Sequence, residues 1–269
     1  MAKADKLPVP FTGKPPKEVP LKRAPLVHVI AQVRFPLLLT VTDPASVAPF
    51  QDLIRSAYPV ADNEVVQRLV MSATAPQEAV KSTAESIWRF QDRNKQWRAS
   101  LAPNFLALET TRYTSRKDFI ARIIFLVAAL ERTLNPQITT RVGLRYIDRI
   151  EGDAVDKIPD LIRPEILGSY TLFAPALRHI LAYAEFATEE GATLGARWGM
   201  LPADGTIDPN VLEPIPSKSW ILDLDMYSGD QSNFSAAALE LQLESFAQRI
   251  YAVFRFMVTE QFLDHYGRN

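Results

Sequence analysis

Hydrophobic and polar side chains alternate along residues 85–92, where Arg89 separates Trp88 from Phe90. A period of two residues predicts a β-strand with one buried side and one solvent-facing side. A turn and two further β-compatible runs follow, so the pattern predicts a hairpin and a third antiparallel strand. These segments are the turn at 93–95 and the strands at 96–101 and 105–111.

The next segment changes to a helical period. Ser115 stands three positions before Asp118, which is typical of a helix start where the serine hydroxyl accepts a hydrogen bond from a free backbone N–H. Apolar residues then recur at intervals of three and four as far as Leu134, which predicts a helix with one apolar stripe. Asn135–Pro136 predicts its end, because proline cannot continue the hydrogen-bond ladder.

Residues 138–150 (ITTRVGLRYIDRI) predict the next strand and the most distinctive surface of the chain. Side chains alternate along a strand, so Arg141, Arg145 and Arg149 share one side. Asp148 falls on the other side. The three arginines suggest a stripe that binds an anion or a protein. The alternative is a solvated sheet face on which each arginine pairs with a carboxylate of a neighbouring strand.

The first part of the chain predicts an arm, two strands and a helix. Residues 1–22 are rich in lysine and proline and should form an extended or disordered arm that docks on its own domain or on a neighbour. Residues 26–35 alternate and predict the first strand, with Val29, Ala31 and Val33 facing the core. The remaining elements are a helix from Asp43 to about Ala57 and a strand at 63–74.

The last part repeats the order of the middle. A hairpin, a long loop, a strand and a long helix are predicted, at 179–188 with 193–200, 201–219, 220–227 and 234–265. The same order occurs at 86–134, which suggests a divergent internal duplication. We therefore predict an α+β fold, with a mostly antiparallel sheet and two long helices packed on it. Its parts are the arm at 1–22 and two α+β halves, at 23–150 and 151–269, that share one compact globule.

Composition fits a globular protein with a large core, since 47% of the 269 residues are hydrophobic. Cysteine is absent, which excludes disulfides, thiol nucleophiles and thiolate metal sites and fits a reducing compartment. The first residues lack the apolar core of an export signal, and the longest apolar run, 123–130, is too short to span a bilayer. We therefore expect a cytoplasmic protein without a membrane partner.

Charge is distributed unevenly although the net charge is only −1. Residues 84–149 hold 12 Lys/Arg against 6 Asp/Glu, whereas residues 150–269 hold 8 against 18. The basic middle and acidic end could pack against each other, pair between copies of the chain, or receive an anionic partner. A total near neutrality makes nucleic acid the less favoured partner.

Few residues suggest chemistry. The three histidines lie in unrelated segments without a second ligand at metal spacing. Asp223 and Asp225 point to one side of a strand, where they could hold a cation or act as a carboxylate pair, although a solvated face explains them as well. No glycine-rich phosphate loop is present among the ten glycines. We predict no catalytic residue, metal or cofactor.

Several segments resemble a known family. They are GLRYIDRI at 143–150, WRF at 88–90, LVHVIAQVRF at 26–35, and WILDLDMY at 220–227 before a long helix. Together they resemble a sporadically distributed family of bacterial proteins of about 250–270 residues that has no established function. In that family asparagine often stands two positions after the tyrosine, where this chain has Asp148. The resemblance implies a bacterial or mobile-element origin and carries over no catalytic residue.

These observations favour a non-catalytic binding or adaptor protein. It would recognise another protein, including a second copy of itself, or an anionic ligand through five basic residues on strand faces, Arg89, Arg98, Arg141, Arg145 and Arg149. The first alternative is an enzyme or a small-ligand pocket between sheet and helix that uses Arg145 with Glu109, Asp148, Asp223 or Asp225. The second is a nucleic-acid binder with a saddle-like duplicated sheet.

Overall fold

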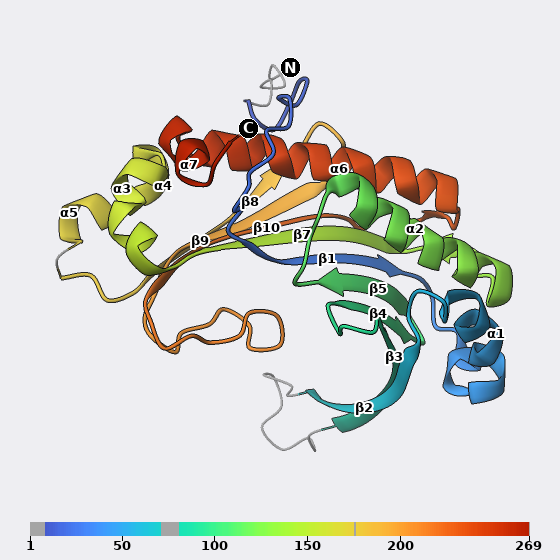
Figure 1. Ribbon diagram of the computed structural model, residues 1–269. Helices are drawn as coiled ribbons and strands as arrows, with labels where there is room; N and C mark the ends of the chain where they lie inside the picture. Colours follow the sequence, from blue (N-terminus) through green and yellow to red (C-terminus); the bar gives the residue numbers. More distant parts are fainter. Residues whose placement is uncertain (1–8, 71–80, 175, 269) are drawn as a thin grey trace.

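A computed structural model of the chain describes residues 9–70, 81–174 and 176–268, and it shows a nine-stranded, fully antiparallel sheet in the order β2-β3-β4-β5-β1-β7-β10-β9-β8 (Figure 1). The predicted α+β class, with a mostly antiparallel sheet, is therefore confirmed. The strands of this sheet are β1 (Leu26–Arg34), β2 (Val60–Val70), β3 (Lys81–Gln91), β4 (Trp97–Ala102), β5 (Phe105–Thr110), β7 (Arg141–Ile150), β8 (Ile180–Ala187), β9 (Thr193–Leu201) and β10 (Ser219–Ser228). A separate two-stranded ladder joins β6 (Ile138–Thr139) to β11 (Ser232–Asn233).

Two long helices cover one face of the sheet, as predicted. The helix α6 (Ala236–Met257) packs on β7 and β10, and α2 (Arg116–Thr133) packs on β5 and against α6 (Figure 1). Within the described ranges, no helix has the length and apolarity needed to cross a bilayer. The shorter helices are η1 (Leu39–Thr42), α1 (Pro44–Ile54), η2 (Gly152–Lys157), α3 (Ile158–Leu161), α4 (Pro164–Leu167), α5 (Tyr170–Phe173) and α7 (Glu260–His265).

Two segments of the chain, which begin at β1 and at β7, have a similar order of elements. In the first segment, β1 is followed by α1, by strands β2 to β5 and then by α2; in the second, β7 is followed by short helices, by β8 to β10 and then by α6. These segments differ from the predicted halves, because β7 lies within the predicted first half, 23–150. They meet where β1 pairs with β7, with Val29 opposite Tyr146, and each contributes one long helix and one side of a continuous sheet. The repeated topology agrees with the proposed duplication, which stays a prediction about the history of the chain.

Local signals in the sequence account for most of the element boundaries. The hydroxyl of Ser115 accepts a hydrogen bond from the backbone N–H of Asp118 at 3.1 Å, which caps α2 as predicted. The carboxylate of Asp43 caps α1 in the same way, through the N–H of Ala45. Such caps satisfy N–H groups that have no partner inside the first turn.

The prediction of one continuous helix at 234–265 is wrong. The helix breaks at Val258, which forms a β-bridge with Ile162, and α7 then begins after Thr259. The Thr259 hydroxyl donates to the carbonyl of Asp160 and accepts from the N–H of Phe262. These contacts to a distant loop offset the loss of helical hydrogen bonds at the break.

Two strand predictions also differ from the structure. The predicted strand at 138–150 is interrupted at Thr140, whose N–H donates to the carbonyl of Arg34 at 2.8 Å. The strand predicted at 63–74 also has different bounds. In the structure β2 starts at Val60, and residues 71–74 lie outside the described residues.

The two faces of the sheet differ in chemistry. The face under the long helices contributes the main core, which includes Val29, Leu144 and Leu224. The other face is concave, because the long central strands arch over it and β2 and β3 curve beneath them (Figure 1). Apolar clusters lie toward its two ends, around Phe105 and around Ile147. Charged side chains occupy the middle of the concave face.

Candidate functional site

The five arginines predicted as a binding surface lie on the concave face. Arg89, Arg98, Arg141 and Arg145 line a hollow of about 310 Å³. Arg149 lies farther along β7, where its guanidinium donates to the carbonyl of Glu213 in the loop beneath the sheet. The structure therefore brings four of the predicted residues together and places the fifth beside them.

Most of these arginines already have carboxylate partners. Arg145 donates two hydrogen bonds to Asp223, at 2.7 and 2.9 Å, and Arg197 of β9 donates to the same carboxylate at 2.9 Å. The Asp223 side chain is 1% exposed. A buried carboxylate held by two guanidinium groups is a structural junction between β7, β10 and β9. Arg145 therefore follows the alternative interpretation of the arginine stripe, in which each arginine pairs with a carboxylate of a neighbouring strand.

A second junction joins β4, β5 and β1. Glu109 accepts a hydrogen bond from Arg98 at 2.5 Å and lies 3.1 Å from Nε2 of His28. Burial alone would raise the pKa of Glu109, but the hydrogen bonds with His28 and Arg98 lower the pKa to about 2. Glu109 is therefore a carboxylate that stabilises the face.

The remaining arginines differ in how tightly they are held. Arg89 donates to Glu64 at 2.9 Å and to Ser100 at 2.6 Å, and Arg149 donates to Glu151 at 2.7 Å. Arg141 is the exception. Its guanidinium donates to Oε1 of Gln32 at 3.4 Å, and its nearest carboxylate contact is longer than the hydrogen bonds of the other arginines. These long contacts leave the guanidinium more available.

Arg141 lies between two hollows of the concave face. Its guanidinium is 3.8 Å from the carboxylate of Asp225 and stacks over the ring of Tyr227 at 4.7 Å. Asp225 lines both the hollow of 310 Å³ and a neighbouring one of about 440 Å³, and burial raises its pKa. The two aspartates that the sequence placed on one side of a strand therefore differ. Asp223 is fixed by two arginines, and Asp225 is held only weakly.

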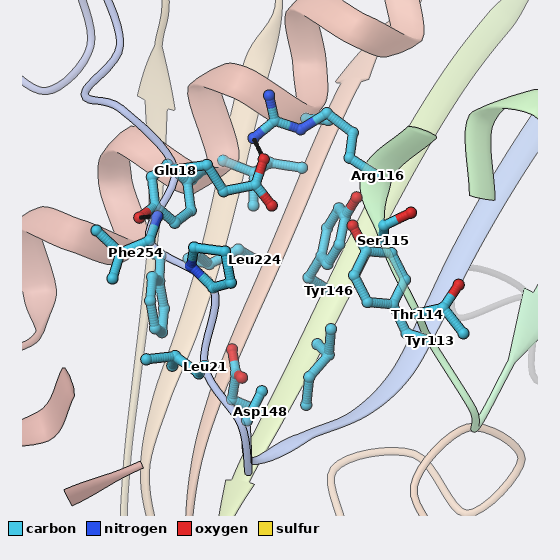
Figure 2. Close-up of a pocket in the computed structure, with 17 residues that line it drawn as sticks. Glu18, Leu21, Tyr113, Thr114, Ser115, Arg116, Tyr146, Asp148, Leu224 and Phe254 are labelled. Atoms are coloured by element: carbon cyan, nitrogen blue, oxygen red, sulfur yellow. Dashed lines mark hydrogen bonds and ion pairs between the residues drawn. The ribbon is translucent and has the colours of Figure 1, made fainter. Parts of the chain in front are cut away.

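A cavity that the sequence did not localise lies on the opposite face of the sheet, beneath α6 (Figure 2). Its volume is about 280 Å³. The walls come from β1, β7, β10, α6, the start of α2 and the N-terminal arm. The residues that line it are Glu18, Val19, Pro20, Leu21, Ala24, Leu26, Tyr113, Thr114, Ser115, Arg116, Tyr146, Asp148, Leu224, Ala247, Ile250, Tyr251 and Phe254.

The arm forms one wall because α6 and the chain around residues 189–190 hold it in place. Arg249 of α6, whose side chain is 1% exposed, donates to the carbonyls of Pro10 and Gly13 and to the carboxylates of Glu189 and Glu190. A guanidinium with this many acceptors fixes the arm to the domain. Residues 9–22 thus dock on their own chain, and residues 1–8 lie outside the described residues.

Further contacts hold the arm at the mouth of the cavity. The N–H of Val19 donates to the hydroxyl of Tyr251 at 2.8 Å. Glu18 forms an ion pair with Arg116 at 3.1 Å, which Figure 2 shows bridging the arm and α2. The arm therefore closes one side of the cavity through polar contacts, while Leu21 and its neighbours face the interior.

Asp148 is the unusual group in this cavity. It is 8% exposed, and its carboxyl group has no hydrogen-bond or ion-pair partner within the ranges that the structure describes. The absence of such a partner lets burial raise its pKa to about 7. In Figure 2 it lies away from the Glu18–Arg116 pair, across apolar side chains. A buried, unpartnered carboxyl is expensive and is typical of a binding or functional site.

Two tyrosines provide the other polar groups in the cavity wall. The rings of Tyr113 and Tyr146 meet edge to face, with centroids 5.6 Å apart. Burial raises the pKa of Tyr146 to about 12, so its hydroxyl group stays protonated at neutral pH. The hydroxyl groups can donate or accept hydrogen bonds.

The sequence contained one signal for this site. Asp148 follows Leu144 and Tyr146 at two-residue spacing, so strict alternation places an acidic residue on the apolar side of the strand. Asp148 is one of the carboxylates predicted for a pocket between sheet and helix. It does not share that pocket with Arg145, because β7 directs Arg145 to the hollow on the concave face and Asp148 to the cavity.

The fold and the cavity define an α+β protein with a pocket enclosed by sheet, helix and arm. Comparisons of the chain with protein-family models, curated proteins and solved structures found no match. The resemblance to a bacterial family therefore stays an expectation.

Proposed function

We propose that the protein is a non-catalytic binding protein that takes a small amphipathic ligand into the cavity beneath α6. The observation that carries this proposal is the buried carboxyl of Asp148, which faces an apolar cavity of about 280 Å³ without a partner in the described chain. Ligand pockets combine apolar walls with a few polar groups and begin near 300 Å³. The cavity has this composition, and its volume lies just below that range, which suits a small ligand.

The experiment is a screen of small amphipathic fragments by ligand-observed NMR, with a variant that fills the cavity. Ala247 of α6 lines the cavity, and Ala247→Met places a longer side chain there. Ala238→Met adds the same atoms to an exposed position of the same helix and serves as the control. We expect binders that Ala247→Met eliminates and Ala238→Met retains. An absence of binders, or binders that are indifferent to Ala247→Met, would contradict the proposal.

A second candidate function is recognition of a partner protein by the concave face. Arg141 supports it, because this guanidinium lies over Tyr227 with a long contact to Asp225 and could exchange that contact for a partner carboxylate. Pairing of the other arginines with carboxylates lowers the positive surplus on which phosphate binding depends. The candidate is therefore a protein partner or an adaptor role, ahead of nucleic acid.

Arg141→Glu tests this second candidate, and Ser100→Ala in the same hollow is its control. Affinity purification from the host followed by mass spectrometry should show partners that are lost with Arg141→Glu and kept with Ser100→Ala. An identical set of partners for wild type and Arg141→Glu would remove the arginine face from consideration. We also propose a cytoplasmic location, a bacterial origin and a homodimer. Light scattering of the purified protein tests whether it is a dimer.

A further inference from the structure

The charges around the cavity are compensated except at Asp148. Among the described residues that line the cavity, the fixed charges belong to Glu18, Arg116 and Asp148. Glu18 and Arg116 neutralise each other at 3.1 Å. An ionised Asp148 therefore leaves the empty cavity with one uncompensated negative charge.

The elements packed around Asp148 present few groups that could compensate this charge. On the neighbouring strands it lies opposite Leu26 and Leu222. The helix α6 contributes Ile250, Tyr251 and Phe254 to the same cavity. Beyond α7, Tyr266 interacts with it electrostatically and itself has a raised pKa. These neighbours are apolar or neutral phenols, so none of them supplies a positive charge.

The chemistry of a matching ligand follows from this arrangement. An anionic ligand would meet a like charge in a medium of low dielectric constant, which disfavours it strongly. A neutral ligand could accept a hydrogen bond from the protonated carboxyl of Asp148, but it would leave the charge of the ionised carboxylate uncompensated. A cation forms a charge-assisted hydrogen bond with the carboxylate and removes the cost of burying it alone.

The rest of the cavity suits the body of such a cation. Leu21, Leu224 and Phe254 offer apolar surface, and the ring of Tyr146 offers an aromatic face beside Asp148 on the same strand. Aromatic rings favour organic ammonium groups over strongly hydrated metal ions. One or two apolar rings or a short chain would fill a cavity of about 280 Å³.

We infer that the ligand is a small organic amine, bound as its ammonium ion with the charged nitrogen on the Asp148 carboxylate and the apolar body beneath α6. This inference rests on the proposed ligand-binding function and names the class of ligand. Binding shifts the carboxyl toward its ionised form, because the ammonium ion stabilises the negative charge.

The test compares three probes of nearly equal shape by isothermal titration calorimetry: benzylamine, benzyl alcohol and benzoate. We expect wild-type protein at about pH 8 to bind benzylamine at least about tenfold more tightly than benzyl alcohol, and benzoate most weakly. A tenfold difference corresponds to about 1.4 kcal/mol of binding free energy. Asp148→Asn should weaken benzylamine binding at least about tenfold and leave benzyl alcohol nearly unchanged.

Asp225→Asn is the matched control, because it removes a partly buried carboxylate from the opposite face of the same sheet. It should bind all three probes as the wild type does, and circular dichroism establishes that both variants fold. Equal affinity for the amine and the alcohol, or an Asp148→Asn protein that still prefers the amine, overturns the amine inference and leaves the pocket. Failure of all three probes, together with an empty fragment screen, overturns the pocket itself.

Discussion

Asp223 and Asp148 lie on opposite faces of the same sheet, and their surroundings differ as much as their positions. Asp223 is 1% exposed and is held by Arg145 and Arg197. Asp148 is nearly as buried and faces a cavity without a charged partner in the described chain. At the scale of the single residue, one carboxylate stabilises the fold and the other costs stability.

We predict that Asp223→Ala destabilises the protein by about 3–5 kcal/mol, because it leaves two partly buried arginines without their shared acceptor. Chemical denaturation measures the change. Asp52→Ala is the control, since Asp52 pairs with Arg55 at the surface and should cost less than about 1 kcal/mol. Equal effects of the two substitutions would show that the β7–β10–β9 junction contributes no more than a surface pair.

Asp148→Asn should have an effect that depends on pH. The folded pKa of about 7 lies above the ordinary value of 3.8, so the folded state holds its proton more tightly than the unfolded state does. The contribution of Asp148 to stability is therefore fully present below about pH 4 and is lost as the pH rises through about 7.

The free energy of unfolding of Asp148→Asn relative to wild type should therefore increase between about pH 4 and pH 8, by up to about 4 kcal/mol. Thermal denaturation across this range measures the difference, with Asp52→Asn at the surface in parallel as the control. A constant difference would mean that the Asp148 carboxyl is solvated or paired in solution.

At the scale of the element, the arm and α6 depend on each other through Arg249. Its guanidinium has acceptors on the arm and on the turn after β8. Glu189 in turn accepts hydrogen bonds from Thr12 and Gly13 of the arm. A cationic residue in the apolar stripe of α6 is thus explained by the segment that it fastens.

We predict that Arg249→Ala loosens the arm and destabilises the protein by about 2–4 kcal/mol, because several buried hydrogen bonds to a charged group are lost. Hydrogen exchange should accelerate at the amides of Val19 and Lys22, which donate to Tyr251 and to the carbonyl of Gly267. Arg55→Ala, at an exposed position, should leave both amides protected. Unchanged protection in Arg249→Ala would mean that the arm is held by its apolar contacts.

Elements fixed by neighbouring residues could be predicted from the sequence, and those fixed by distant contacts could not. The hairpin after Phe90 and the start of α2 at Ser115 follow from local turn and cap chemistry. The break after α6 depends on Thr259 and the carbonyl of Asp160, which are far apart in the chain. Short-range signals carry no information about such a contact.

The same distinction applies to the site. Alternation along β7 placed the arginines on one side and Asp148 on the other, as the structure has them. The partner of Arg145 lies on another strand, 78 residues away, and the walls around Asp148 come from both ends of the chain. Alternation predicts which side of a strand each residue faces, but it does not predict which elements cover that side.

At the scale of the whole molecule, Glu109 on the concave face makes stability depend on pH in the direction opposite to Asp148. Glu109 has a folded pKa of about 2, below the ordinary 4.5. Its contribution to stability is therefore present above about pH 4.5 and is lost as the pH falls toward 2. The two faces of the sheet thus limit stability from opposite ends of the pH scale.

We predict that Glu109→Gln lowers the free energy of unfolding by about 3 kcal/mol near pH 7 and flattens the loss of stability between about pH 4.5 and 2. Acid titration followed by circular dichroism measures both effects. Glu64→Gln, whose side chain is half exposed and pairs with Arg89, is the comparison and should change the acid transition little. Parallel acid transitions for wild type and Glu109→Gln would contradict the assignment.

The docked arm has a consequence for synthesis of the chain. Residues 10–22 leave the ribosome before the groups that hold them, Arg249, Tyr251 and Gly267, because more than 200 residues separate the arm from α6. The arm therefore stays without its final contacts until α6 and the residues after it have emerged. Closure of the cavity follows the synthesis of α6, and a ligand present at that moment can be enclosed as the arm docks.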